Sequence, residues 1–99
     1  MDSREKTVEE VQEEVIDHTR SLIEYWDKQS GSTYDKLEGL AFSIFSMLDG
    51  CSMLPAFKVS PMMADGDKEY YIENGENYYP ENIDIAGELH SLFMKSKNE

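Results

Sequence analysis

The sequence predicts one α+β domain, with about three helices packed on a small antiparallel sheet that contains a tyrosine-rich hairpin. Three segments carry apolar residues at helical spacing, and residues 70–79 have nearly symmetric flanks around Asn74-Gly75. The 99 residues leave room for a single hydrophobic core. We therefore expect one domain over residues 1–99, with residues 1–6 as a flexible tail.

The first helix is predicted by its start signal and its periodicity. Thr7 and Glu10 have the spacing of a capping box, in which hydroxyl and carboxylate each accept a hydrogen bond from a free backbone N–H. Gly31 can end the helix after Lys28. Apolar residues recur between these signals at intervals of three, four and seven: Val8, Val11, Val15, Leu22 and Trp26. The pattern predicts an amphipathic helix of about 22 residues.

Residues 35–48 are best explained by a second helix. Asp35 and Glu38 give another capping signal, and Asp49-Gly50 can end the run. Apolar residues again follow helical intervals: Leu37, Leu40, Ala41, Ile44, Phe45 and Leu48. A buried strand is the alternative, because Leu40, Phe42 and Ile44 also alternate and Gly39 is a poor residue inside a helix.

The remaining segments predict the sheet and a third helix. Prolines bound residues 54–61, which are typical of a short edge strand. Asn74-Gly75 favours the positive φ angles of a two-residue hairpin turn, which would place Tyr71 opposite Tyr78. Residues 82–97 carry an apolar stripe followed by Lys95 and Lys97, the arrangement expected of a helix with basic residues at its C-terminal end.

Composition restricts the possible partners and setting. The chain has 21 acidic against 9 basic residues and a formal net charge of -12. Direct binding to nucleic acid or to an anionic membrane is disfavoured by this charge, whereas a basic protein surface is favoured. The sequence has no apolar run long enough to cross a membrane and no apolar N-terminal leader. With Cys51 as the single cysteine, a cytoplasmic location is expected.

The acidic side of the first helix is the main candidate binding surface. Several of its carboxylates lie four residues apart, where like charges destabilise an isolated helix and a basic partner would relieve the repulsion. The predicted partner-binding residues are Glu9, Glu10, Glu13, Glu14, Asp17, Tyr71 and Tyr78. These residues predict a non-enzymatic adaptor, inhibitor or immunity-like protein. A more specific hypothesis is that the protein mimics nucleic acid. The alternative is that the acids only keep the fold soluble.

A calcium loop is a second hypothesis. Carboxylates and one tyrosine occupy loop positions 1, 3, 5, 7, 9 and 12, in the order Asp65, Asp67, Glu69, Tyr71, Glu73 and Glu76. Tyr70 occupies the position where such a loop needs glycine, and the predicted hairpin uses part of the same segment. The prediction is therefore no metal and no cofactor, with calcium binding as the alternative.

Catalysis is not expected, because the sequence offers few suitable residues. Phosphate-binding glycine loops and the common hydrolase motifs are absent. A thiol enzyme that pairs Cys51 with His90 or His18 is the third hypothesis, since such partners are assembled in space rather than in sequence. A homodimer is also possible, because three amphipathic helices and a hairpin can leave apolar surface uncovered.

Four stretches in the C-terminal two-thirds of the chain carry a resemblance to other proteins. They are residues 37–50, Leu54-Pro55-Ala56-Phe57, residues 75–80 and residues 84–90. These stretches resemble small uncharacterised bacterial and phage-type acidic proteins. The resemblance implies a bacterial cytoplasmic origin and brings no activity or site residue with it.

Overall fold

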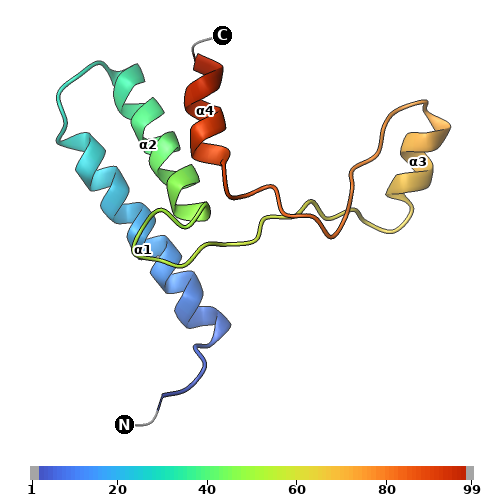
Figure 1. The fold of residues 1–99 in the computed structure, drawn as a ribbon, viewed down its shortest axis with the longest axis horizontal. Coiled ribbons are helices and arrows are strands. Elements are labelled where there is room, and N and C mark those ends of the chain that lie inside the picture. Colours follow the sequence, from blue (N-terminus) through green and yellow to red (C-terminus); the bar gives the residue numbers. More distant parts are fainter. Residues whose placement is uncertain (1–2, 98–99) are drawn as a thin grey trace.

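All regular secondary structure that the computed structural model describes, over residues 3–97, is helical. The helices are α1 (Val8–Asp27), α2 (Thr33–Leu48), α3 (Asp67–Glu73) and α4 (Leu89–Lys97) (Figure 1). The predicted α+β fold is therefore wrong, because neither the hairpin nor the edge strand forms in the described part of the chain.

Helix α1 confirms its predicted start. The Thr7 hydroxyl accepts a hydrogen bond from the Glu10 N–H at 3.1 Å, and the Glu10 carboxylate accepts one from the Thr7 N–H at 2.8 Å. The helix ends at Asp27, with Lys28 as its C-terminal cap. Residues 3–6 of the predicted tail have no regular structure, and residues 1 and 2 lie outside the described range.

Helix α2 confirms the helical interpretation of the second segment. It begins earlier than predicted, because the Ser32 hydroxyl accepts a hydrogen bond from the Asp35 N–H and caps the first turn. Gly39 has a packing role: a Cβ atom added there would lie 2.5 Å from Cη2 of Trp26. The indole N–H of Trp26 also donates to the Ser43 hydroxyl at 2.9 Å. The glycine thus lets the ring lie directly against α2.

The predicted hairpin is replaced by α3. The N–H of Gly75 donates to the Ile72 carbonyl at 3.1 Å, and the N–H of Glu76 donates to the Tyr71 carbonyl at 2.9 Å. Gly75 has a φ of 69°. These two bonds and the positive φ form a Schellman motif, which closes a helix. The Asn74-Gly75 pair therefore ends a helix instead of turning a hairpin.

The predicted edge strand over residues 54–61 is irregular. Its backbone meets the returning chain at one place, where the Ile85 N–H donates to the Val59 carbonyl and the Val59 N–H donates to the Asp84 carboxylate, both at 2.8 Å. Pro55 and Pro61 lack backbone N–H donors, which limits any longer ladder of hydrogen bonds.

Helix α4 begins at Leu89, seven residues after the predicted start at residue 82. Gly87, with a φ of 120°, lies just before it and has a backbone conformation that helices do not contain. The Phe93 ring lies 5.4 Å from the Phe45 ring of α2, measured between centroids. At the other end of α4, Lys97 forms an ion pair with Glu38 of α2 at 2.7 Å.

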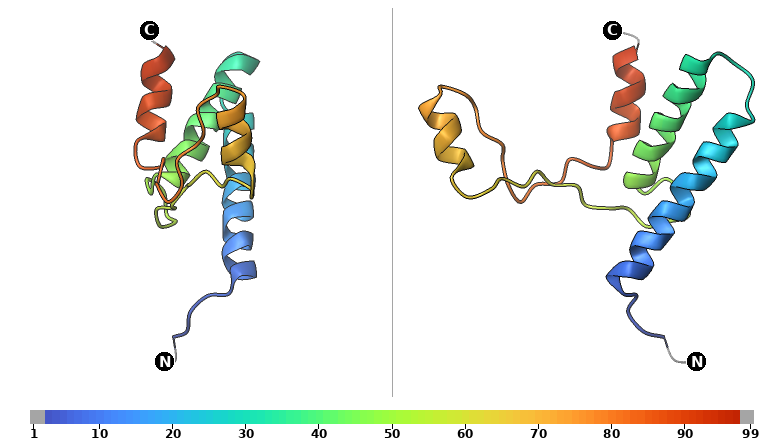
Figure 2. Two further views of the ribbon diagram at one scale, coloured as in Figure 1. Left: turned by 90° about the vertical axis from the view of Figure 1, so that its right-hand side faces the viewer. Right: turned by 180° about the vertical axis from the view of Figure 1, so that it is seen from behind.

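The molecule divides into a helical body and a projecting arm. In the body, α2 packs against α1 on one side and α4 on the other. The arm, residues 51–88, first runs beside α1 and the end of α2, where the Phe57 N–H donates to the Leu48 carbonyl at 3.0 Å. It then projects from the body, carries α3 at its far end and returns to α4 (Figures 1 and 2). The radius of gyration is 17.6 Å, whereas a compact chain of this length has about 13 Å. Met47, 3% exposed, is the single buried hydrophobic residue among those described.

Candidate functional site

The acidic residues predicted to bind a partner divide into two groups on α1. Glu10 and Glu14 form ion pairs with residues that precede the helix, Glu10 with Arg4 at 2.7 Å and Glu14 with Lys6 at 2.6 Å. The hydrogen bond from Arg4, assisted by the backbone N–H of Thr7, lowers the pKa of Glu10 to about 2. These two carboxylates are therefore already neutralised in part by the chain itself.

Glu9, Glu13 and Asp17 make up the second group, which we call the acidic row. All three are exposed, and no ion pair to any of them occurs within residues 3–97. They follow each other at intervals of four residues, about 6 Å along the helix axis. The acidic row is thus a line of uncompensated negative charge on the outer side of α1.

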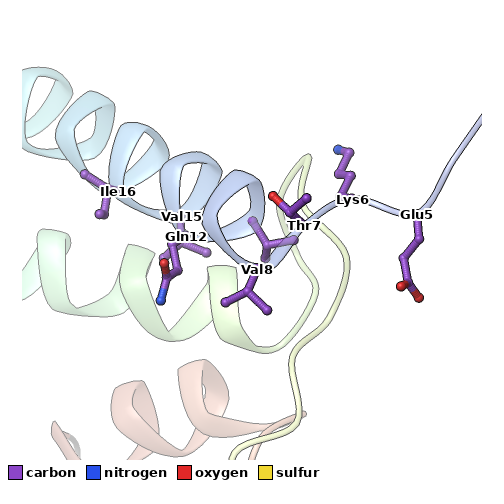
Figure 3. Close-up of a pocket in the computed structure, with 8 residues that line it drawn as sticks. Glu5, Lys6, Thr7, Val8, Gln12, Val15 and Ile16 are labelled. Carbon is purple, nitrogen blue, oxygen red and sulfur yellow. The ribbon is translucent and has the colours of Figure 1, made fainter.

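An apolar stripe lies on another side of the same half of α1, with Val11 and Val15 turned farthest from the acidic row and Ile16 next to it. It consists of Val8, Val11, Val15 and Ile16 and lines an open groove of about 880 Å³ (Figure 3). Val8 is 69% exposed and Ile16 is 57% exposed. The N-terminal half of α1 extends past the end of α2 (Figures 1 and 2). Val11 and Val15 are half-buried and share a pocket with Leu54, Pro55 and Phe57, so Val8 and Ile16 are the exposed members of the stripe.

The two predicted tyrosines lie far from these carboxylates. Tyr71 belongs to α3 and Tyr78 follows it, at the end of the arm away from α1 (Figure 1). Tyr71 packs on Tyr79 with ring centroids 6.0 Å apart, and the Lys68 ammonium lies 4.9 Å from the centre of the Tyr78 ring. The structure therefore does not join the tyrosines and the acidic row into one surface.

The candidate calcium segment does not form a loop. Asp67, Glu69 and Glu73 lie within α3, and the Asp67 carboxylate accepts a hydrogen bond from the Ala64 N–H at 2.9 Å. The outer members of the set are Asp65 and Glu76, on either side of the helix. Over residues 3–97, no group of three or more histidine, cysteine, aspartate or glutamate side chains is placed to hold a metal ion.

Cys51 and His90 are brought together, although 38 residues separate them in the sequence. The Cys51 Sγ lies 3.9 Å from Nε2 of His90, and Nδ1 of His90 lies 2.5 Å from the Asp49 carboxylate. Cys51 is exposed, whereas the Asp49 side chain is fully buried. With the Nδ1 proton held by the carboxylate, Nε2 carries the lone pair of the ring and lies near two donors, the Cys51 thiol at 3.9 Å and the Ser91 hydroxyl at 3.4 Å. The order thiol, imidazole, carboxylate is that of an assisted cysteine nucleophile.

Asp49 also has a structural role at the start of α4. Its carboxylate accepts the backbone N–H of His90 at 2.8 Å and that of Gly87 at 2.5 Å. Burial favours the neutral acid, but the hydrogen bonds from the His90 ring and from backbone N–H groups outweigh it and lower the pKa of Asp49 to about 2. The ionised side chain therefore caps α4 and attaches it to the end of α2.

Sequence reasoning had no means of assigning Asp49 to this site. Asp49-Gly50 has the pattern of a helix end, and Asp49 lies 41 positions before His90 in the sequence. The second histidine considered, His18, lies in α1 and is not part of the cluster.

Comparisons with known proteins add no family to these observations. Neither the family models, nor the curated proteins, nor the solved structures contain a match to the chain. None of the helices described between residues 3 and 97 has the length and apolar character needed to cross a membrane.

Proposed function

We propose that the protein is a non-enzymatic acidic binding module that docks a basic protein surface on the acidic row of α1. The observation that supports this most directly is that Glu9, Glu13 and Asp17 are exposed and without an internal ion pair, although Arg4 and Lys6 neutralise their neighbours. A cytoplasmic adaptor or inhibitor role fits the chemistry of such a surface.

Charge complementarity explains why a basic partner suits this surface. Each exposed carboxylate is solvated and free to pair, so a partner with lysine or arginine side chains at matching spacing gains Coulomb energy without breaking an internal ion pair. The sharper version of the proposal is that the partner normally binds nucleic acid, with the acidic row taking the place of a line of phosphates. Binding of either kind weakens as salt concentration rises.

The test compares two triple variants of equal net charge. Glu9→Gln, Glu13→Gln and Asp17→Asn remove the acidic row, whereas Glu73→Gln, Glu76→Gln and Glu81→Gln remove three exposed acids of the arm. With a fluorescent lysine-rich peptide as the probe in low salt, we expect the first variant to raise Kd about tenfold, from about 0.5 kcal/mol per lost charge pair. The arm variant should change Kd less than about twofold. Equal losses in the two variants would contradict the proposed site.

A second candidate function, a cysteine nucleophile assisted by His90, is favoured by the Cys51, His90 and Asp49 arrangement. The imidazole Nε2 is positioned to take the thiol proton while sulfur attacks an electrophilic carbon. In the reaction with iodoacetamide, the S–C bond forms, the C–I bond breaks with loss of iodide, and the proton passes to His90. The buried Asp49 carboxylate stabilises the resulting imidazolium.

Alkylation kinetics test this second candidate. We expect His90→Gln to slow the reaction of Cys51 with iodoacetamide at pH 7 by about tenfold or more, because a general base usually contributes at least that much. His18→Gln is the matched control and should leave the rate unchanged, since His18 lies outside the cluster. If His90→Gln reacts as fast as the parent chain, His90 serves only to hold α4 on Asp49.

A further inference from the structure

The chain exposes more surface than a compact monomer of its size. Its accessible area is 8124 Å², whereas a folded monomer of this mass exposes about 5,800 Å². The excess is about 2,300 Å². Much of it is apolar, including Met53 and Met62 of the arm, which are 98% and 93% exposed.

Helix α3 in particular lacks the packing that a helix of its length needs. It has 7 residues, and isolated helices shorter than about 12 residues are marginal in water. Tyr70 is 62% exposed and Ile72 is 56% exposed, and α3 does not pack against any of the other described helices. The arm therefore carries apolar side chains that the rest of the same chain does not cover.

We infer that the chain forms an arm-exchanged homodimer, in which the arm of one copy lies on the apolar stripe of α1 in the other copy. One chain contains both a stripe whose members Val8 and Ile16 are exposed and an arm whose far end, with α3, is unpacked. In a dimer with a two-fold axis, the arm of each copy covers the stripe of the other, so the same contact occurs twice. Gly50 and Gly87, with φ angles of 86° and 120°, bound the arm and give the chain a left-handed conformation at each of its two ends.

The area favours a second copy as the occupant. If each chain buries its excess accessible surface in the interface, the dimer buries about 4,600 Å² in total. This area falls within the range of about 2,000–5,000 Å² for obligate homodimers. The interface would be mainly apolar, as is usual for such dimers. Because a helix turns about 100° per residue, Val8, Val11 and Val15 lie well away from the acidic row, whereas Ile16 is at the edge of the stripe that borders it.

Charge gives the dimer a salt dependence opposite to that of the proposed basic partner. Each copy has a formal net charge of -12, so two copies repel each other and apolar burial has to overcome that repulsion. Added salt screens the repulsion and should tighten the dimer, whereas it should weaken docking of a basic surface on the acidic row. Failure of one proposal is thus distinguishable from failure of the other.

The first measurement is the mass of the full-length chain in solution by light scattering, at low and high salt. We expect the mass of two chains at micromolar concentration, with the dimer dissociation constant falling several-fold between about 50 mM and 500 mM sodium chloride. A single-chain mass at both salt concentrations overturns the inference.

Complementation between two variants tests the arm exchange itself. Val8→Lys changes the stripe and Tyr70→Glu changes the arm, at two exposed positions on separate elements. Each variant alone should raise the dimer dissociation constant at least tenfold. An equimolar mixture should recover dimer, because one arm contact is then unaltered and the other joins the new lysine to the new glutamate. Dimerisation of Tyr70→Glu alone at the parental affinity, or no recovery in the mixture, overturns the exchange.

Discussion

Asp49→Ala is expected to lower the free energy of unfolding by about 3 kcal/mol and to loosen the first turn of α4. The substitution removes a helix cap worth about 1 kcal/mol and the charge-assisted hydrogen bond to the His90 ring, worth about 2 kcal/mol. It also leaves the N–H groups of Gly87 and His90 without their acceptor. Urea unfolding followed by circular dichroism measures the loss, and Asp65→Ala, at an exposed position, is the matched control.

The same carboxylate gives this prediction a pH dependence. The pKa of Asp49 is lowered to about 2 in the folded chain, against an ordinary value of 3.8. A lowered pKa contributes stability that is fully present above pH 4 and is lost as the pH falls towards 2. The cost of Asp49→Ala should therefore shrink over that interval. A cost that stays constant from pH 5 to pH 2 would contradict the assigned role of the ionised side chain.

Gly39→Ala is expected to destabilise the body by about 2 kcal/mol, although alanine is the better helix former by about 1 kcal/mol. The added methyl would lie 2.5 to 2.7 Å from three carbon atoms of the Trp26 ring, and overpacking of this kind costs about 3 kcal/mol. A shift of the ring that relieves this clash would break the hydrogen bond from its N–H to Ser43. Thermal unfolding together with tryptophan fluorescence measures the effect.

A double-mutant cycle separates this clash from any general effect on α2. In a Trp26→Leu background the ring is gone, so Gly39→Ala should become neutral or stabilising. Should Gly39→Ala cost the same in both backgrounds, close contact between Trp26 and Gly39 is not the reason for the glycine.

The helices of the body could be predicted because their signals are local. The Thr7 and Glu10 capping box and the periodic stripe act within α1 itself, and the position of the acidic row follows from helical geometry once that helix exists. The spacing of apolar residues in residues 35–48 likewise predicts a helix rather than a strand, and α2 confirms this prediction. Only the packing of Trp26 explains why Gly39 is tolerated there.

The hairpin prediction was wrong because one local signal has two uses. Asn74-Gly75 supplies positive φ, which a tight hairpin turn and a Schellman helix end both require. Which of the two forms depends on the carbonyl groups that accept the backbone N–H groups of the turn. Here the carbonyls of Tyr71 and Ile72 accept the N–H groups of Glu76 and Gly75, and the chain closes a helix.

By itself, the sequence determined the helical nature of α1 and α2, the charge of the molecule and the acidic side of α1, whereas the ion pairs of Arg4 and Lys6 in the structure show which of its carboxylates are unpaired. These features depend on residues three or four positions apart, whose geometry the backbone period sets. Only the tertiary structure decided the late start of α4, the projection of the arm, and the meeting of Asp49, Cys51 and His90. Those depend on contacts between distant segments, where neither periodicity nor capping chemistry specifies which residues meet.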